Sequence, residues 1–144
     1  HGDSMVAMLG ITEINGKKIN ELVKEGKIKK EKLNQIIERT KKGGAEIVKY
    51  LEKGSAFYAP AASGIEMAES YLQDLKKQLP CAAYLDGEYG IKDLYAGVPV
   101  IIGSGGVEKV VELDLSPEEK SSFEKSIQSV RNLFKDAQKI DSYL

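Results

Sequence analysis

The stretch from Gly54 to Leu79, GSAFYAPAASGIEMAESYLQDLKKQL, decides how the rest of the chain is arranged. Its first half, through Ile65, has no charged side chain and is crowded with small residues. Pro60 suits the first turn of a helix, where its missing N–H loses no hydrogen bond. Apolar residues then recur at spacings of three and four, which places them on one helical face: Ala61, Ile65, Ala68, Leu72, Leu75 and Leu79. The pattern predicts a buried core helix near residues 57–78.

Upstream of this helix, the sequence predicts a second helical region over residues 30–53. Its apolar residues keep a helical period across Gly43 and Gly44, and two glycines inside a helix indicate a kink or the close approach of another backbone. Nearer the N-terminus, Asn15 and Gly16 predict a tight turn. The polar stretch 17–30 has room for one short helical turn.

Downstream of the core helix the pattern changes to that of strands. Residues 81–84 predict a first strand, and residues 94–102 predict a second, in which Pro99 indicates an edge or bulge position. The glycine-rich segment 103–106 is typical of a hairpin connection. Residues 111–115 alternate between apolar and polar and predict a third strand.

The last predicted element is a C-terminal helix near residues 117–139. Ser116 and Glu119 have the spacing of a capping box, and Pro117 suits the first helical position. The apolar residues that follow mark one helical face: Phe123, Ile127, Val130, Phe134 and Ala137. Together, these elements predict an α+β fold, with an antiparallel sheet of about three or more strands packed with long helices.

The composition limits the classes of protein and of partner that are expected for this chain. The chain has 144 residues, enough for one domain, and its 42% hydrophobic and 30% charged residues are ordinary for a soluble globular protein. A net charge of −1, with lysine and glutamate interleaved, gives no reason to expect a nucleic acid or membrane partner. Cys81 is the single cysteine, which excludes an internal disulfide and favours a reducing, cytoplasmic compartment.

Most candidate sites in the sequence have a structural explanation. The loop 103–106 opens a strand rather than a helix, so we interpret it as a hairpin and expect no cofactor-binding residue in it. Cys81 has no second cysteine beside it and the chain has one histidine, so we expect no metal site. We interpret Cys81 as a small buried hydrophobe.

His1 is the only histidine, and it leaves two interpretations open. Its ordinary pKa would let it exchange protons near neutral pH, which suits a general acid or base. The alternative is a disordered terminal residue, because chain ends are commonly disordered.

Three segments together resemble the lactate/malate dehydrogenase family. They are HGDSMV at residues 1–6, GSAFYAPAAS at residues 54–63 and DGEYGIKDLYAGVPVIIGSGGV at residues 86–107. The likeness extends to about Leu133 in the family's order and spacing, and it is greatest to bacterial malate dehydrogenases of the lactate-dehydrogenase-like type. The resemblance implies that His1 is the catalytic histidine. It also implies that Ala56 and Pro60 lie near the substrate and nicotinamide pockets.

The resemblance further implies that residues 1–144 are the C-terminal catalytic domain of a longer enzyme, without its N-terminal Rossmann domain. The parent would be an NAD-dependent, homo-oligomeric malate dehydrogenase of the tricarboxylic acid cycle, with a small dicarboxylate as substrate. The missing domain would bind NAD, so we expect this fragment alone to be inactive. Two alternatives stay open: an L-lactate dehydrogenase of the same family, and a detached, non-catalytic oligomerisation module.

The sequence departs from the family pattern just after HGDSMV. Ala7 and Gly10 stand where the family usually has a proline and a basic residue. The segment 5–14 is apolar with almost no charge, so we expect it to promote association with another copy of the chain.

Overall fold

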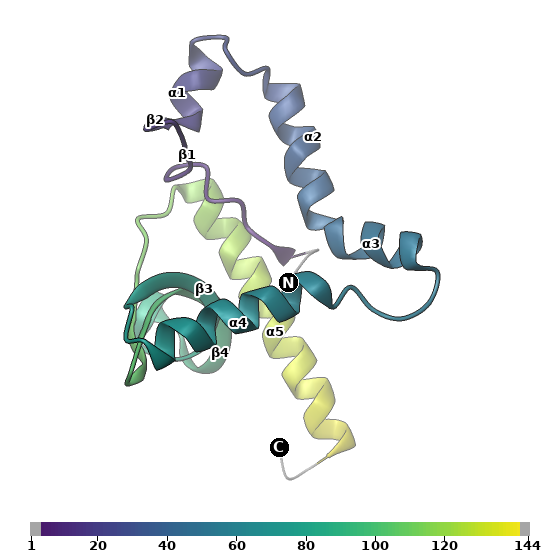
Figure 1. The fold of residues 1–144 in the computed structure, drawn as a ribbon, viewed down its shortest axis with the longest axis vertical. Helices are drawn as coiled ribbons and strands as arrows, with labels where there is room; N and C mark the ends of the chain where they lie inside the picture. Colours follow the sequence, from purple (N-terminus) through teal and green to yellow (C-terminus); the bar gives the residue numbers. More distant parts are fainter. Residues whose placement is uncertain (1–3, 142–144) are drawn as a thin grey trace. The chain divides into compact units, whose positions relative to one another are not determined.

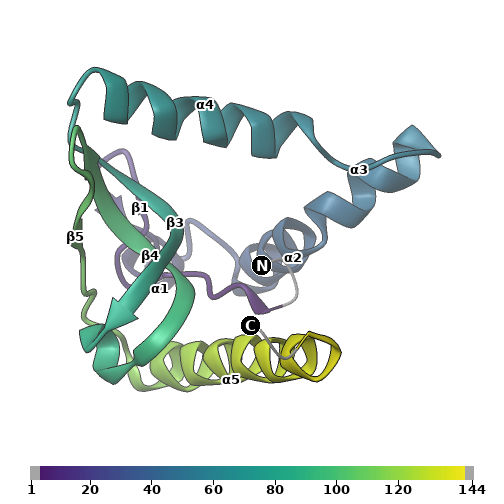
Figure 2. The ribbon, with the colours of Figure 1, turned by 90° about the horizontal axis from the view of Figure 1, so that it is seen from below.

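The computed structural model describes residues 4–141, which divide into two compact units. One unit combines the N-terminal part of the chain, up to Lys53, with the C-terminal part from Asp114. The other is continuous, from Gly54 to Leu113. Figure 1 follows the chain through both units, and Figure 2 shows the same ribbon turned by 90°.

The continuous unit is built on a three-stranded antiparallel sheet. Its strands are β3 (Lys77–Asp86), β4 (Lys92–Gly103) and β5 (Gly106–Val110), in the spatial order β3-β4-β5. Alternate residues along β4 are buried, and Leu85 and Val100 are fully excluded from solvent. The sheet therefore carries the main apolar core of this unit. Together with the helices, it confirms the predicted α+β fold class.

The structure contradicts the edge position predicted for Pro99, and the register shift of the β4–β5 pair lies nearby, between Ile101 and Ile102. β4 is the central strand, so Pro99 does not lie on an edge strand. It faces Pro80 of β3, and its carbonyl accepts a hydrogen bond from the Val111 N–H at 2.8 Å. The last β4–β5 pair joins Val100 to Val110, so Pro99 lies where the pairing with β5 ends. A missing N–H is tolerated there because little of the ladder remains to be lost.

The third strand lies earlier in the sequence than predicted. β5 begins at Gly106, directly after the two-residue turn Ser104-Gly105, and ends at Val110. The prediction of a strand over 111–115 is wrong, because after the Val111 N–H bond to Pro99 the backbone of this segment bonds to a side chain rather than to a strand. The Tyr89 hydroxyl donates to the Val111 carbonyl at 2.8 Å and accepts from the Leu113 N–H at 3.0 Å.

Tyr89 lies in a three-residue 3₁₀ turn, η2 (Glu88–Gly90), between β3 and β4. Its φ of 53° is in the left-handed region, which is uncommon for a side chain of this size. The strained backbone is held in place by the two hydrogen bonds of the hydroxyl.

The core helix is present but shorter and more exposed than predicted. α4 spans Tyr58–Leu72, and Ser70 is its only buried residue, so the prediction of a buried helix is wrong for this chain. Ile65 is 70% exposed and Leu72 is 78% exposed, although both lie on the predicted apolar face. Beyond Leu72 the chain turns sharply, and residues 77–79, which the periodicity placed on the helix, belong to β3.

The other unit begins with a small hairpin and three helices. Strands β1 (Glu13–Ile14) and β2 (Lys17–Lys18) flank the predicted turn at Asn15-Gly16, where both residues have positive φ. The helices are α1 (Ile19–Lys24), α2 (Lys30–Lys41) and α3 (Gly43–Leu51).

The predicted kink at the glycine pair is confirmed. α2 ends at Lys41 and α3 starts at Gly43, with Lys42 between them. A Cβ added to Gly43 or Gly44 would meet no atom within 4 Å. The pair therefore marks a change of helix direction, and no close approach of another backbone requires it.

The C-terminal helix α5 (Pro117–Ile140) starts as predicted. Ser116 and Glu119 form a complete capping box, with Pro117 in the first turn. Phe123 and Ile127 are the buried residues of the helix. None of the helices in the described part of the chain is long and apolar enough to cross a membrane.

Candidate functional site

His1, the candidate catalytic residue, lies outside the described residues. The structure describes the chain from Ser4, and the half-buried residues that follow it belong to the same unit as α5. The Gly10 N–H donates to Glu119 Oε1 at 3.1 Å, which fixes this segment to the first turn of α5. A Cβ at Gly10 would lie 3.5 Å from that carboxylate, an ordinary contact distance.

Ala56 and Pro60 lie together at the start of α4. Ala56 is half-buried in the loop before the helix, and Pro60 is an exposed residue of its first turn, as predicted. The Phe57 carbonyl accepts the first intrahelical bond, from the Ala61 N–H at 2.9 Å. The two residues predicted to flank the substrate therefore share one helix start, within the continuous unit.

Two aromatic rings stand beside them. Phe57 and Tyr58 have ring centroids 4.5 Å apart and are 53% and 71% exposed. Exposed aromatic rings next to small residues give this helix start an apolar surface. Sequence reasoning singled out the small residues and missed the rings, which a run of two aromatics before Pro60 could have signalled.

The glycine-rich loop is a hairpin whose donors are occupied by carboxylates. The Ser104 N–H donates to Asp74 Oδ1 at 2.8 Å, and the Gly105 N–H donates to Glu108 Oε1 at 3.4 Å. The backbone hydrogen bond from Ser104 holds the pKa of Asp74 below its usual range. A phosphate cradle needs free N–H donors, so this loop does not fit a dinucleotide pyrophosphate.

Cys81 is half-buried on β3, and burial raises the pKa of its thiol. A protonated thiol is a poor nucleophile and a poor metal ligand. Among residues 4–141, no group of histidine, cysteine, aspartate and glutamate side chains is arranged to hold a metal ion.

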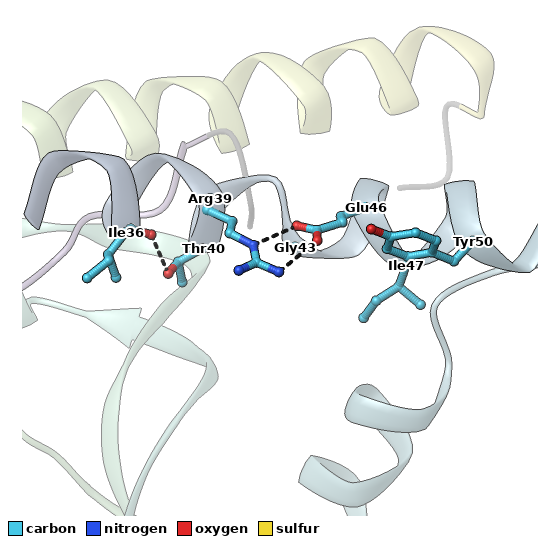
Figure 3. A pocket seen from close by; sticks show the side chains of 7 residues that line it. All are labelled: Ile36, Arg39, Thr40, Gly43, Glu46, Ile47 and Tyr50. Atoms are coloured by element: carbon cyan, nitrogen blue, oxygen red, sulfur yellow. Dashed lines mark hydrogen bonds and ion pairs between the residues drawn. The ribbon is translucent and has the colours of Figure 1, made fainter. Parts of the chain in front are cut away.

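A groove at the junction of α2 and α3 was not predicted. Its volume is about 430 Å³, and Figure 3 labels the seven residues that line it: Ile36, Arg39, Thr40, Gly43, Glu46, Ile47 and Tyr50. Arg39 donates to both oxygens of Glu46, at 3.0 and 2.8 Å. This paired hydrogen bond lowers the pKa of Glu46 and joins the two helices across the kink.

Comparison with known proteins decides the family. The sequence model described as lactate/malate dehydrogenase, alpha/beta C-terminal domain, matches residues 1–140. The chain belongs to this family. It is 60% identical over 141 residues to the malate dehydrogenase of Pelagibacter ubique, which covers 98% of the chain. It is 54% identical over 144 residues to that of Caulobacter vibrioides, which covers all of it.

Solved structures of the family share the fold. The chain resembles the malate dehydrogenase of Cryptosporidium parvum with a TM-score of 0.92 and 47% identity, over 96% of this chain and 44% of that one. It resembles the lactate dehydrogenase of Eimeria maxima, solved with NADH and oxamate, with a TM-score of 0.91 and 43% identity, over 98% of this chain and 44% of that one.

The chain spans only 44% and 45% of the two curated relatives. The family assignment therefore covers the domain, and the activity of the whole protein is a separate question.

Proposed function

We propose that residues 1–144 are the C-terminal catalytic domain of an NAD-dependent malate dehydrogenase, which interconverts malate and oxaloacetate. The observation that carries the proposal is the 60% identity to a malate dehydrogenase over nearly the whole chain. Among the solved structures, malate dehydrogenases at 47% and 43% identity and lactate dehydrogenases at 43% and 39% share the fold almost equally, so these structures do not separate the two activities.

In the proposed reaction, His1 is the general acid and base. Its imidazole accepts the proton of the malate hydroxyl during oxidation and returns a proton to the oxaloacetate carbonyl oxygen in reverse. An imidazole suits both directions because its ordinary pKa lies close to neutral pH. Ala56 and Pro60 would line the substrate and nicotinamide side of the site, where small and ring-closed side chains leave room for a ligand.

The cofactor is assigned to the parent enzyme and not to the described residues. The only glycine-rich loop of the described part has its N–H groups bonded to Asp74 and Glu108, so it does not fit a pyrophosphate. We propose that NAD is held by a Rossmann domain in the rest of the parent. When bound, NAD supplies the hydride acceptor, while this domain contributes the proton transfer and part of the substrate pocket.

The test is the variant His1→Asn in the full-length parent. Asparagine keeps a polar side chain of similar reach but cannot exchange protons near neutral pH, so turnover of oxaloacetate should fall by about 10²–10⁴-fold. NADH binding, measured by fluorescence titration, should change little because the cofactor is assigned to the other domain. Near-normal turnover in this variant would exclude His1 as the acid and base.

The same assay separates malate from lactate dehydrogenase. We expect kcat/KM of the unmodified parent to be higher for oxaloacetate than for pyruvate. A preference for pyruvate would replace the proposal with its alternative, because the two classes share this fold.

We also propose that the chain acts as a homo-oligomer in a reducing, cytoplasmic compartment. Support for association comes from large apolar side chains that are exposed in the single chain, including Ile11 of the segment 5–14, Ile36 of α2 and Leu133 of α5. The single cysteine suits the compartment. Light scattering of the purified chain should show a dimer or larger species, and a clean monomer at high concentration would contradict this part.

A further inference from the structure

A groove of about 250 Å³ lies within the unit that contains α5, between the N-terminal segment, the end of α2 and one face of α5. Its polar lining consists of two lysines and four serines: Ser4, Lys41, Ser122, Lys125, Ser126 and Ser129. Met5 and Val6 provide the apolar part of the lining. We infer that this groove binds a small dianionic oxyanion, either inorganic phosphate or a short dicarboxylate.

The first argument is the arrangement on α5. Ser122, Lys125, Ser126 and Ser129 follow one another at spacings of three, one and three residues, so they share one face of the helix. The buried residues of the helix, Phe123 and Ile127, lie beside this stripe. On this stripe, the hydroxyls of Ser122 and Ser126 and the ammonium of Lys125 can donate hydrogen bonds, and donors of this kind suit an anion.

The second argument is charge. Lys41 and Lys125 both line the groove, and among residues 4–141 no aspartate or glutamate does. Lys41 is the last residue of α2, where its positive charge offsets the partial negative charge of the helix end. Its Nζ lies 3.3 Å from Glu38 Oε1, a carboxylate outside the lining, and its side chain is 28% exposed. An oxyanion in the groove would meet two ammonium groups, one of them already paired with Glu38, and no acid among the described lining residues.

The third argument is unused hydrogen-bonding capacity. The Ser129 hydroxyl donates to the Lys125 carbonyl at 3.2 Å, which leaves its oxygen able to accept only. The hydroxyls of Ser122 and Ser126 have no hydrogen-bond partner within residues 4–141. Two hydroxyls and two ammonium groups can therefore donate to the same ligand, and hydrogen bonds that join an ammonium to an anionic oxygen are the stronger ones.

Size selects the ligand class. The groove is smaller than the roughly 300–1,000 Å³ of pockets that enclose drug-sized ligands. A phosphate or a four-carbon dicarboxylate fits such a space. None of the six polar residues has a role in the proposed dehydrogenase reaction, so either proposal can fail without the other.

The experiment is an NMR titration of the 144-residue chain with sodium phosphate and, separately, with succinate, at an ionic strength held constant with chloride. Saturable shifts at the amides of residues 122–129 and 41 in either titration support the site, and the ligand with the lower Kd identifies its source. Absence of saturable shifts at these amides with both ligands overturns the inference.

Two double variants with the same charge change separate a site from general attraction. Lys41→Gln with Lys125→Gln removes both groove cations, whereas Lys42→Gln with Lys120→Gln removes two exposed cations from outside the lining. The first pair should weaken binding by about tenfold or more, because each ammonium makes a charge-assisted contact. The second pair should change Kd by less than about twofold, since neither ammonium lines the groove and exposed charges are screened by salt. Equal losses in the two pairs would overturn the inference.

The variant Ser126→Ala provides a test that leaves the charge unchanged. It should weaken binding measurably while the dispersion of the amide spectrum stays that of the unmodified chain. Unchanged affinity in Ser126→Ala together with equal losses in the two lysine pairs would leave only nonspecific attraction.

Discussion

Replacing Ser70 with alanine should destabilise the unit of residues 54–113 more than any other loss of a single hydroxyl from α4. Ser70 is fully buried near the C-terminal end of that helix. Its hydroxyl donates to the Ile102 carbonyl at 2.7 Å and accepts from the Lys77 N–H at 3.2 Å. Lys77 and Ile102 face each other as the first pair of the β3–β4 ladder, so the hydroxyl joins the helix to the point where the sheet begins.

The expected magnitude follows from what alanine leaves behind. The change removes one oxygen and creates almost no cavity, so the loss comes from the hydrogen bonds. A buried donor or acceptor without a partner is destabilising by about 1–3 kcal/mol, which gives an expected loss of about 2 kcal/mol here. For a chain of this length that corresponds to a decrease in Tm of about 4–8 °C.

The assay is urea unfolding followed by far-UV circular dichroism, because the chain has no tryptophan to report by fluorescence. Hydrogen exchange should show faster opening of the amides of β3 and β4 in Ser70→Ala. The matched control is Ser63→Ala, on the same helix but exposed, which should change the free energy of unfolding by less than about 0.5 kcal/mol. A Ser70→Ala variant as stable as the control would refute the reasoning.

Three further predictions concern the carboxylate of Glu119, the hydroxyl of Tyr89 and the binding of NADH. Partial burial works to raise the pKa of Glu119, but hydrogen bonds from the N–H groups of Ser116 and Gly10 outweigh it and hold that pKa below its usual range. The stability that Glu119 contributes is therefore present above its unfolded pKa and is lost as pH falls through the lower folded pKa. The variant Glu119→Gln should flatten this acid limb when Tm is measured against pH. An acid limb unchanged in the variant would contradict the prediction. Tyr89→Phe should lower the free energy of unfolding by about 1–3 kcal/mol, because the Val111 carbonyl and the Leu113 N–H lose the hydroxyl that bonds to both. Urea unfolding measures this change, and Tyr95→Phe, at an exposed tyrosine, is the control. The isolated 144-residue chain should bind no NADH measurable by calorimetry, and micromolar binding would contradict the assignment of the cofactor to another domain.

The parts of the fold that the sequence predicts well are those specified by local chemistry. The start of α5 follows from Ser116, Pro117 and Glu119, which satisfy the first N–H groups of the helix with residues three positions apart. The turn at Asn15-Gly16 follows from two residues that tolerate positive φ. In both cases the decisive contacts join near neighbours in the sequence, so no knowledge of the tertiary structure is needed.

The parts that the sequence misplaces depend on contacts between distant residues. The alternation of residues 111–115 resembles a strand, and their side chains do alternate between half-buried and exposed. Their backbone nevertheless bonds to the hydroxyl of Tyr89, more than twenty residues earlier, which periodicity cannot reveal. The end of α4 is another example, because Leu75 and Leu79 keep the helical spacing while the Ser70 hydroxyl and the Asp74 carboxylate bond to β4 and its turn.

The exposed face of α4 is the most informative difference between sequence and structure. Apolar periodicity predicts that a face is covered, but it does not identify what covers it. In this chain Ser70 is buried and bonds to the sheet, whereas Ile65 and Leu72 are largely exposed to solvent. The rings of Phe57 and Tyr58, at the other end of the helix, are exposed as well. Covering these exposed side chains with further protein surface would stabilise the helix further, since burial of apolar area is favourable. The relatives have more than twice the length of this chain, so they contain enough protein to provide that surface. Ala56 and Pro60 lie at the start of the same helix. We therefore expect the protein surface that covers α4 also to complete the proposed substrate pocket.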